Sequence, residues 1–306
     1  MKLKRIMAVC ISILLVVSLF GCSRVIKPDT GKISVYTSFY VMYDFASKIG
    51  GEKAEVINMV PSGTEPHDWE PDAADITGLE RAQLFIFNGK GMEHWVEDVL
   101  KTIGNKELIV VEAAKGIPDL PEKHSDSEES GDGHSDPHVW LNPVFAKQEL
   151  LNIKNGFIQA DPKNAEYYEA NYNRYVAELD ALDKEFKDAI QPLNRRDIVV
   201  SHEAFGYLCE GYGLNQIAVD GLTPDSEPDA ARVAEIIKYI KDNDVKVIFF
   251  ENQSSAKVAE TIAANSGAKV GVLNPIEGLS AEKTANGEDY FSVMRENLAA
   301  IVSALE

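Results

Sequence analysis

The sequence comprises 306 residues, of which 45% are hydrophobic, and carries a formal net charge of −19 at pH 7. This acidity argues against a nucleic-acid partner, because nucleic-acid-binding proteins present basic surfaces to the phosphates. A chain of this length also exceeds the size that one hydrophobic core usually organises, so two domains are expected.

The N-terminal residues are typical of an export signal. Basic side chains at positions 2, 4 and 5 precede an apolar run over residues 6–20, which is shorter than the about 20 residues that a membrane-spanning helix needs. Gly21 and Cys22 follow, and a small residue before a cysteine resembles the lipobox of bacterial lipoproteins. We expect 1–21 to be a lipoprotein signal peptide, Cys22 to be acylated and 22–32 to form a tether; an ordinary secretory signal is the alternative. Cys209 would then have no partner for an intramolecular disulfide.

Strand-like and helix-like segments alternate through the first half of the chain. The expected strands are 33–39, 54–60, 84–88 and 107–111, with helices such as 40–49 and 73–81 between them. This alternation predicts a mainly parallel sheet flanked by helices. Residues 119–137 break the pattern with prolines, glycines, serines and seven acidic residues, and are expected to form a loop that contains His124 and His134.

A long amphipathic helix is predicted over residues 162–190. Asp161 suits its N-cap and Pro162 its first turn, and apolar side chains recur at steps of three and four from Tyr168 to Ile190. At 1.5 Å per residue the helix would be roughly 43 Å long. It is interpreted as a stiff connection between two domains, although an ordinary surface helix would give the same pattern.

A second strand-helix series follows and resembles the first in organisation. Its expected strands are 197–201, 215–219, 245–250 and 269–273, and its helices include 228–242, 255–266 and 290–305. The predicted fold is therefore α/β with two lobes, each a mainly parallel four-stranded sheet flanked by helices. The lobes are assigned to 33–158 and 193–306, and the connecting helix to 159–192.

Three of the six histidines follow segments where ligands of α/β proteins bind. His67 comes after the second strand, His138 ends the acidic loop and His202 closes the fifth strand. Ligands of open α/β sheets bind beyond the carboxyl ends of the strands, so these imidazoles can converge between two lobes. Neutral imidazole is the commonest zinc ligand. For any one histidine, an ordinary hydrogen-bonding role remains open; for His94, on a predicted helix, it is the favoured interpretation.

The sequences around these histidines resemble a known family. Pro-Ser-Gly-Thr-Glu-Pro-His67-Asp-Trp-Glu-Pro, Asp-Pro-His138-Val-Trp-Leu-Asn-Pro and Ser-His202-Glu-Ala-Phe-Gly-Tyr are similar to the metal-ligand motifs of TroA/ZnuA-type (cluster A-I) receptors of ABC transporters. The resemblance covers the chain from about residue 33 to the end. It implies two α/β lobes joined by a rigid helix, with a metal ion between the lobes.

The resemblance also implies which metal is bound. Manganese-binding relatives carry a carboxylate as third ligand, where this chain has His202, and an aspartate as fourth, where it has Asn274. The pattern is most similar to zinc receptors of the AdcA kind, in which a nearby glutamate completes the site, so Glu277 is nominated as fourth ligand. A water molecule in that position is the alternative, and three imidazoles suit zinc better than manganese.

Other residues near the ligands receive secondary assignments. Glu65, Asp68 and Glu203 are candidates for hydrogen bonds to the imidazoles, and Asn142 stands where many relatives have aspartate. Trp69 and Trp140, each two residues after a ligand, are expected to wall the site, and Glu251 is expected to be structural rather than ligating. His124 and His134 resemble a sparse version of the family's His-rich loop, which implies auxiliary metal capture or merely a solvated loop.

We therefore expect a lipid-anchored, monomeric receptor on the extracytoplasmic face of the cell membrane. Its ligand would be Zn²⁺, carried to the permease of an ABC importer. The alternatives are the same role for manganese or another divalent metal, or a surface adhesin. An enzyme is not expected, because the chain contains neither His-Glu-x-x-His nor Gly-x-Ser-x-Gly.

Overall fold

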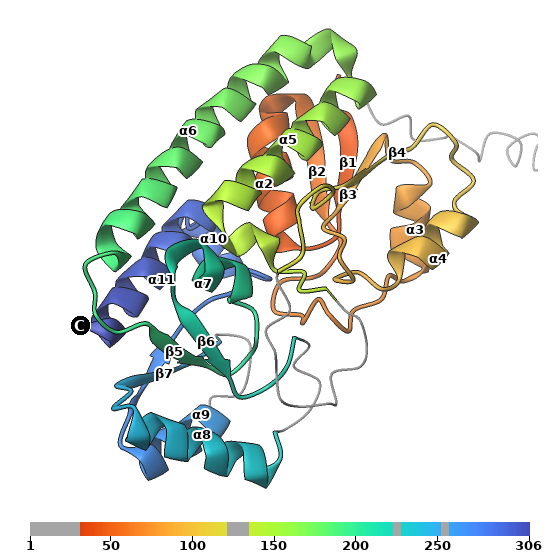
Figure 1. Ribbon diagram of the computed structural model, residues 1–306. Helices are drawn as coiled ribbons and strands as arrows, with labels where there is room; N and C mark the ends of the chain where they lie inside the picture. The colour runs from red at the N-terminus through yellow and green to blue at the C-terminus, as the bar shows by residue number, and fades with distance from the viewer. Residues whose placement is uncertain (1–30, 121–134, 223–227, 252–256) are drawn as a thin grey trace, which may run out of the picture. The chain divides into compact units, whose positions relative to one another are not determined.

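The computed structural model describes residues 31–120, 135–222, 228–251 and 257–306. Residues Ile33–Glu306 form one compact unit that contains both sheets, and the description below concerns that unit (Figure 1). None of the helices in these ranges is both long enough and apolar enough to cross a membrane.

The first sheet is parallel throughout and has the strand order β2-β1-β3-β4. Its strands are β1 (Ile33–Thr37), β2 (Ala54–Asn58), β3 (Leu84–Phe87) and β4 (Ile109–Glu112). The second sheet repeats this arrangement in the order β6-β5-β7-β8, with β5 (Asp197–Val200), β6 (Asn215–Ala218), β7 (Val247–Phe250) and β8 (Lys269–Val272). The predicted pair of parallel four-stranded sheets is confirmed, with strand ends within about two residues of those expected.

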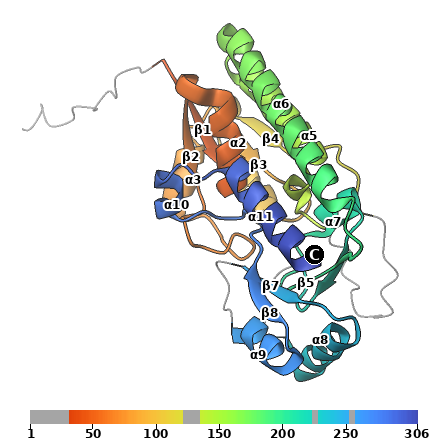
Figure 2. The same ribbon diagram turned by 90° about the vertical axis from the view of Figure 1, so that its left-hand side faces the viewer.

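Helices make the crossovers that parallel strands require. They are α2 (Tyr40–Gly50), α3 (Ala73–Leu79), α4 (Val96–Thr102), α5 (Pro143–Ala160), α6 (Ala165–Ile190), α7 (Gly206–Tyr212), α8 (Ala230–Asp242), α9 (Lys257–Ser266), α10 (Ala281–Ala285) and α11 (Tyr290–Leu305), with the 3-10 turns η2 (Gly51–Lys53), η3 (Val139–Leu141) and η4 (Pro162–Asn164). Figures 1 and 2 both show α5 beside α6 near the first sheet, and α8 with α9 beside the second.

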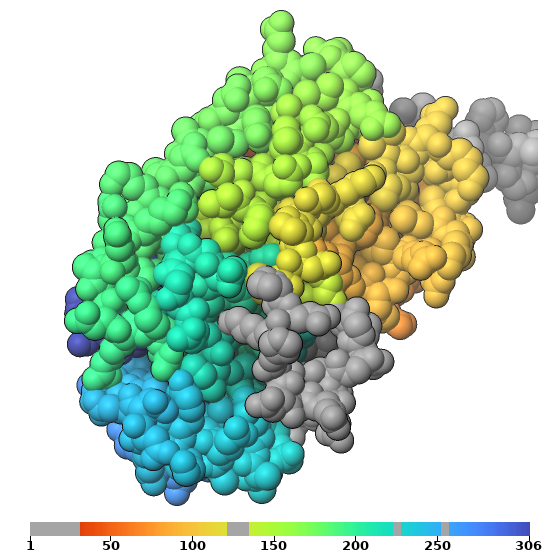
Figure 3. All heavy atoms as spheres, in the orientation of Figure 1, coloured from red at the N-terminus to blue at the C-terminus, as the bar shows by residue number. Residues whose placement is uncertain are grey.

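The long helix is present, but it begins later than predicted. α6 has 26 residues, about 39 Å, because Pro162–Asn164 form a 3-10 turn. Asp161 does not cap it; its carboxylate instead accepts hydrogen bonds from the Tyr168 hydroxyl and the Asn164 amide, both at 2.7 Å. The predicted apolar stripe is buried from Tyr168 to Ile190, while the opposite face lies at the surface along the whole helix (Figure 3).

A second long helix was not predicted from the sequence. α5 begins immediately after η3, with Pro143 in its first turn and the Asn142 side chain accepting a hydrogen bond from the Val144 backbone N–H at 2.9 Å. It packs along α6 and against α2 and β4. The connection between the lobes is therefore braced by a helical pair rather than by α6 alone.

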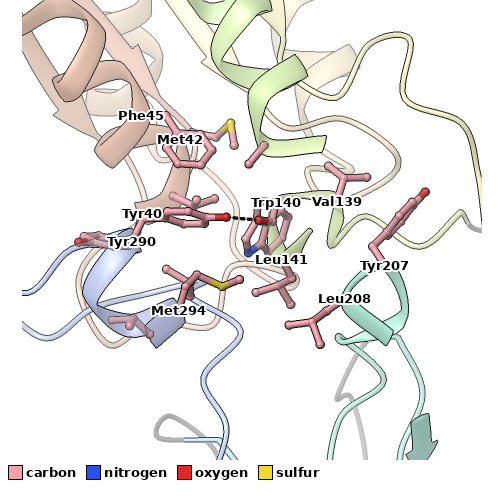
Figure 4. Packing of buried hydrophobic residues seen from close by; sticks show 14 of the residues in the cluster. Tyr40, Met42, Phe45, Val139, Trp140, Leu141, Tyr207, Leu208, Tyr290 and Met294 are labelled. Atoms are coloured by element: carbon pink, nitrogen blue, oxygen red, sulfur yellow. Dashed lines mark hydrogen bonds between the residues drawn. The ribbon is translucent and has the colours of Figure 1, made fainter. Parts of the chain in front are cut away.

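The core centres on Trp140, which η3 carries into the space between the lobes (Figure 4). Its side chain is fully buried, and its ring lies 5.2 Å from that of Phe39 in the first lobe. The Tyr290 hydroxyl on α11 donates a hydrogen bond of 2.7 Å to the Trp140 carbonyl. One continuous apolar cluster thus joins both lobes to α5, α6 and α11.

Candidate metal centre

The residues predicted to bind metal lie in four loops at the carboxyl ends of strands or just before a helix. His67 follows β2, His138 immediately precedes η3, His202 follows β5 and Glu277 follows β8. All four are buried, with between 0% and 8% of each residue exposed. The carboxyl ends of parallel strands lie at one edge of a sheet, so loops that are distant in sequence come together there, as was expected.

Glu277 lies at the centre of the group. Its Oε1 atom is 3.0 Å from Nε2 of His138, 3.5 Å from Nε2 of His67 and 4.0 Å from Nδ1 of His202. The ring centroids of the three histidines are 5.0–5.5 Å apart, and one ligand atom from each of the four residues lies within 4.8 Å of the others. A tetrahedral zinc ion with bonds near 2.0–2.1 Å separates its ligand atoms by about 3.3–3.4 Å, so small side-chain movements suffice to close the group around an ion.

Glu277 is held as a carboxylate. Burial alone would raise its pKa, but the hydrogen bond with His138 and the nearby imidazoles of His67 and His202 together hold that pKa well below its usual range. An ionised oxygen is therefore present among the three rings. Nε2 of His67 has no hydrogen-bond donor or acceptor among the described residues, which leaves it available to an ion at the same point.

His138 is oriented by a carboxylate. Its Nδ1 atom lies 2.8 Å from Oδ1 of Asp136, which also accepts a hydrogen bond from the His138 backbone N–H at 2.9 Å. Nε2 consequently faces Glu277 and the other rings. Burial disfavours a charge on His138, but the hydrogen bonds with Asp136 and Glu277 raise its pKa above the usual value.

His202 is hydrogen-bonded at both ring nitrogens. Nδ1 lies 2.6 Å from Oε1 of Glu251, and Nε2 lies 2.8 Å from the carbonyl oxygen of Leu222. Both partners are acceptors, so the metal-free ring carries two protons. Burial lowers the pKa of His202, but the bond to Glu251 and the charge of Glu277 override it and raise the pKa to about 10. One of the two bonds must break before this ring can bind a metal, and the bond to a neutral carbonyl is the weaker one.

The carboxylates that hydrogen-bond the rings, Asp136 and Glu251, are not the three that were predicted from the sequence. Asp68 and Glu203 are exposed, and Glu65 accepts a hydrogen bond from the backbone N–H of His67 at 3.3 Å, not from its ring. Asp136 lies two positions before His138, so the same criterion could have found it. The contact of Glu251 with His202 follows from the pairing of two strands.

Strand pairing explains why Glu251 meets His202. β5 and β7 are parallel neighbours with Val200 opposite Phe249. Extending this register by two residues places His202 opposite Glu251, although they are 49 positions apart in sequence. The sequence-based interpretation of Glu251 as non-ligating is compatible with this contact, but it missed the role in orienting a ring.

Comparison with known proteins is in accord with this geometry. The family model described as "ZnuA: Zinc-uptake complex component A periplasmic" matches residues 35–304. The chain belongs to the ZnuA family. High-affinity zinc uptake system protein ZnuA of Bacillus subtilis is 42% identical over 281 residues, which is 90% of this chain and 88% of that protein.

Two further ZnuA-family relatives are informative. Zinc-binding lipoprotein AdcA of Streptococcus pneumoniae serotype 4 is 37% identical over 289 residues, covering 92% of this chain but 58% of AdcA. The chain thus spans little more than half the length of the AdcA relatives that it matches. The crystal structure of the Zn(II)-bound ZnuA-like domain of Streptococcus pneumoniae AdcA is 36% identical, has a TM-score of 0.79, and covers 90% of this chain and 99% of that domain.

The remaining predicted residues have separate roles in this ZnuA-family chain. The ring of Trp140 lies 5.3 Å from that of His138 and walls the site as expected, whereas Trp69 packs edge-on against Trp95 at 5.4 Å. Asn142 caps α5. His94 is exposed and lies 3.5 Å from a surface glutamate. The predictions for His124, His134 and Cys22 fall outside the described residues.

Proposed function

We propose that this chain is an extracytoplasmic receptor that binds one Zn²⁺ through His67, His138, His202 and Glu277 and delivers it to the permease of an ABC importer. The observation that carries the proposal is the convergence of these four buried side chains at one point. Membership of the ZnuA family supports the transport role, and relatives named for zinc uptake and zinc binding support the choice of ion.

The donor set favours zinc over manganese. Three imidazole nitrogens and one carboxylate oxygen match the tetrahedral coordination of Zn²⁺, whereas Mn²⁺ prefers oxygen ligands. Copper and nickel can bind such a set more tightly than most divalent ions, so selectivity in the cell also depends on metal availability.

A receptor fits the site better than an enzyme does. Catalytic zinc sites keep one coordination position open for water, while four protein ligands around a tetrahedral ion close it. A buried, closed site holds an ion as cargo, and no covalent chemistry is needed for that task.

We further propose that Cys22 carries the lipid that anchors a monomeric receptor to the membrane, since an AdcA relative is named a lipoprotein. We also assign residues 33–158 and 193–306 to the two lobes and 159–192 to their helical connection, which the two separate sheets support. Replacing Cys22 by serine should move the protein from the membrane fraction to the medium or periplasm. Retention in the membrane would refute the anchor.

Single substitutions test the ligand set. His67→Ala, His138→Ala and His202→Ala should each weaken zinc binding by at least about tenfold, because losing one ligand opens the coordination shell. His94→Ala, which removes an exposed imidazole, is the matched control and should leave the affinity unchanged. Wild-type affinity in any of the three ligand variants would remove that residue from the proposed site.

A further inference from the structure

The loop that presents Glu277 contains an unusual backbone conformation. Residues 273–277, named here the Glu277 turn, follow β8, and Ile276 within it has a φ angle of +64°. A β-branched side chain clashes with its own backbone in this left-handed region, which is why non-glycine residues there are uncommon. Ile276 is also fully buried, so water does not support the conformation. Contacts with neighbouring residues must therefore stabilise this conformation of the turn.

Hydrogen bonds from helix α11 and from the turn itself supply that support. The Asn297 side-chain amide accepts a hydrogen bond from the backbone N–H of Asn274 at 2.9 Å and donates one to the carbonyl of the same residue at 2.7 Å. The Asn274 side chain then accepts a hydrogen bond from the Ile276 N–H at 2.8 Å. Asn297 is 2% exposed, so this two-way contact is shielded from water.

A residue of η3 also holds the turn. Nε1 of Trp140 donates a hydrogen bond of 2.7 Å to the carbonyl of Pro275. The backbone of Asn274 and Pro275, which leads into Ile276, is therefore fixed by two buried side chains, one from α11 and one from η3. The Asn297 amide is both donor and acceptor and so satisfies the two Asn274 backbone groups at once, which an apolar side chain at position 297 would leave without partners.

We propose that Asn297 is a positioning residue that holds the Glu277 turn in its strained conformation and thereby places the Glu277 carboxylate among the three imidazoles. Without the amide, the buried backbone groups of Asn274 lose their partners, and Ile276 relaxes towards negative φ. Glu277 is the next residue in the chain, so this rotation carries its carboxylate away from the rings. The proposal rests on the metal site of the proposed function.

The test uses the chain with Asn297 replaced by alanine. Zinc affinity is measured by chelator competition, and the visible absorption of bound Co²⁺ reports the coordination geometry. We expect the zinc dissociation constant to rise about 10- to 100-fold, as for other residues that orient metal ligands. We also expect the Co²⁺ spectrum to shift towards that of Glu277→Gln, which marks a site without its carboxylate ligand.

Two further variants separate positioning from general destabilisation. Ile301→Ala removes a fully buried side chain one turn along α11 from Asn297, so it should lower the melting temperature while leaving the Co²⁺ spectrum unchanged. Ile276→Gly accepts positive φ without a clash, so Asn297→Ala should weaken zinc binding less in that background than in the wild type.

The outcomes distinguish this inference from the proposed function. A wild-type protein with no four-coordinate Co²⁺ site would refute the metal centre itself. A normal wild-type site together with an unchanged affinity and spectrum in Asn297→Ala would refute the positioning role alone. Equal effects of Asn297→Ala in the wild-type and Ile276→Gly backgrounds would refute strain at Ile276 as the reason that the amide is needed.

Discussion

The contact between Glu251 and His202 leads to a prediction of defined size. Glu251→Gln keeps the shape of the side chain but removes its charge from a hydrogen bond of 2.6 Å between two groups that are no more than 5% exposed. The metal-free ring already makes this bond, so only its strengthening on metal binding counts; residues that orient a metal-ligating histidine typically contribute about 10- to 100-fold in metal affinity, with roughly 1.4 kcal/mol for each factor of ten. We therefore expect the zinc dissociation constant to rise about 10- to 100-fold, because the ring is less well oriented and is a poorer electron donor.

The measurement is zinc affinity by chelator competition, combined with the ¹⁵N shifts of the His202 ring. The shifts should show that Nδ1 keeps its proton and Nε2 binds the metal, since the bond to the Leu222 carbonyl is the one that breaks. Glu70→Gln is the matched control: Glu70 lies 3.5 Å from an exposed histidine and should change nothing. Unchanged or tighter binding in Glu251→Gln would contradict the reasoning and would mean that Glu251 competes with the metal for Nδ1.

Four other predictions follow from buried charges and from the acidic loop. The pKa of metal-free His202 is raised from 6.5 to about 10, so zinc must displace a proton from this ring. Zinc affinity should therefore rise about tenfold per pH unit for each proton displaced between pH 7 and 9. Binding that is independent of pH in titration calorimetry would refute this. The same raised pKa stabilises the metal-free fold fully below pH 6.5, and chemical denaturation should show that stability declining as pH rises towards 10. Burial and the nearby Glu93 raise the pKa of Glu149, and no described residue hydrogen-bonds either of its oxygens. Glu149→Met should therefore raise the unfolding free energy at pH 8 by about 1–3 kcal/mol, with a smaller gain near pH 5. Deleting residues 122–135 should leave the tight zinc site intact in the same chelator assay, and its loss would mean that the loop contributes a ligand.

Patterns with a short period predicted most of the fold. Alternating strands and helices gave both parallel sheets, because buried parallel strands have compact apolar sequences that are easily recognised. The start of α6 was wrong by three residues, since Asp161 and Pro162 form an equally plausible helix start in sequence. α5 was missed altogether, although Asn142 and Pro143 mark its beginning.

The site was harder to derive from local sequence than the fold. Placement after strands identified three histidines as candidates, but Glu277 came from a family resemblance, because nothing in its own segment distinguishes it from a surface carboxylate. Glu251 and Asn297 act across 49 and 23 positions respectively, and only strand register and helix docking bring them to their partners. Such contacts depend on tertiary structure, so the spacing of residues in the sequence does not predict them.

The most direct test of the zinc receptor is the metal content of a soluble chain beginning at Ser23. The protein would be purified without added metal, its bound elements counted by mass spectrometry, and zinc then titrated against excess manganese. We predict one tightly held zinc ion per chain that manganese does not displace. Preferential binding of manganese would overturn the metal assignment, and the absence of stoichiometric metal after incubation with zinc would contradict the proposed site itself.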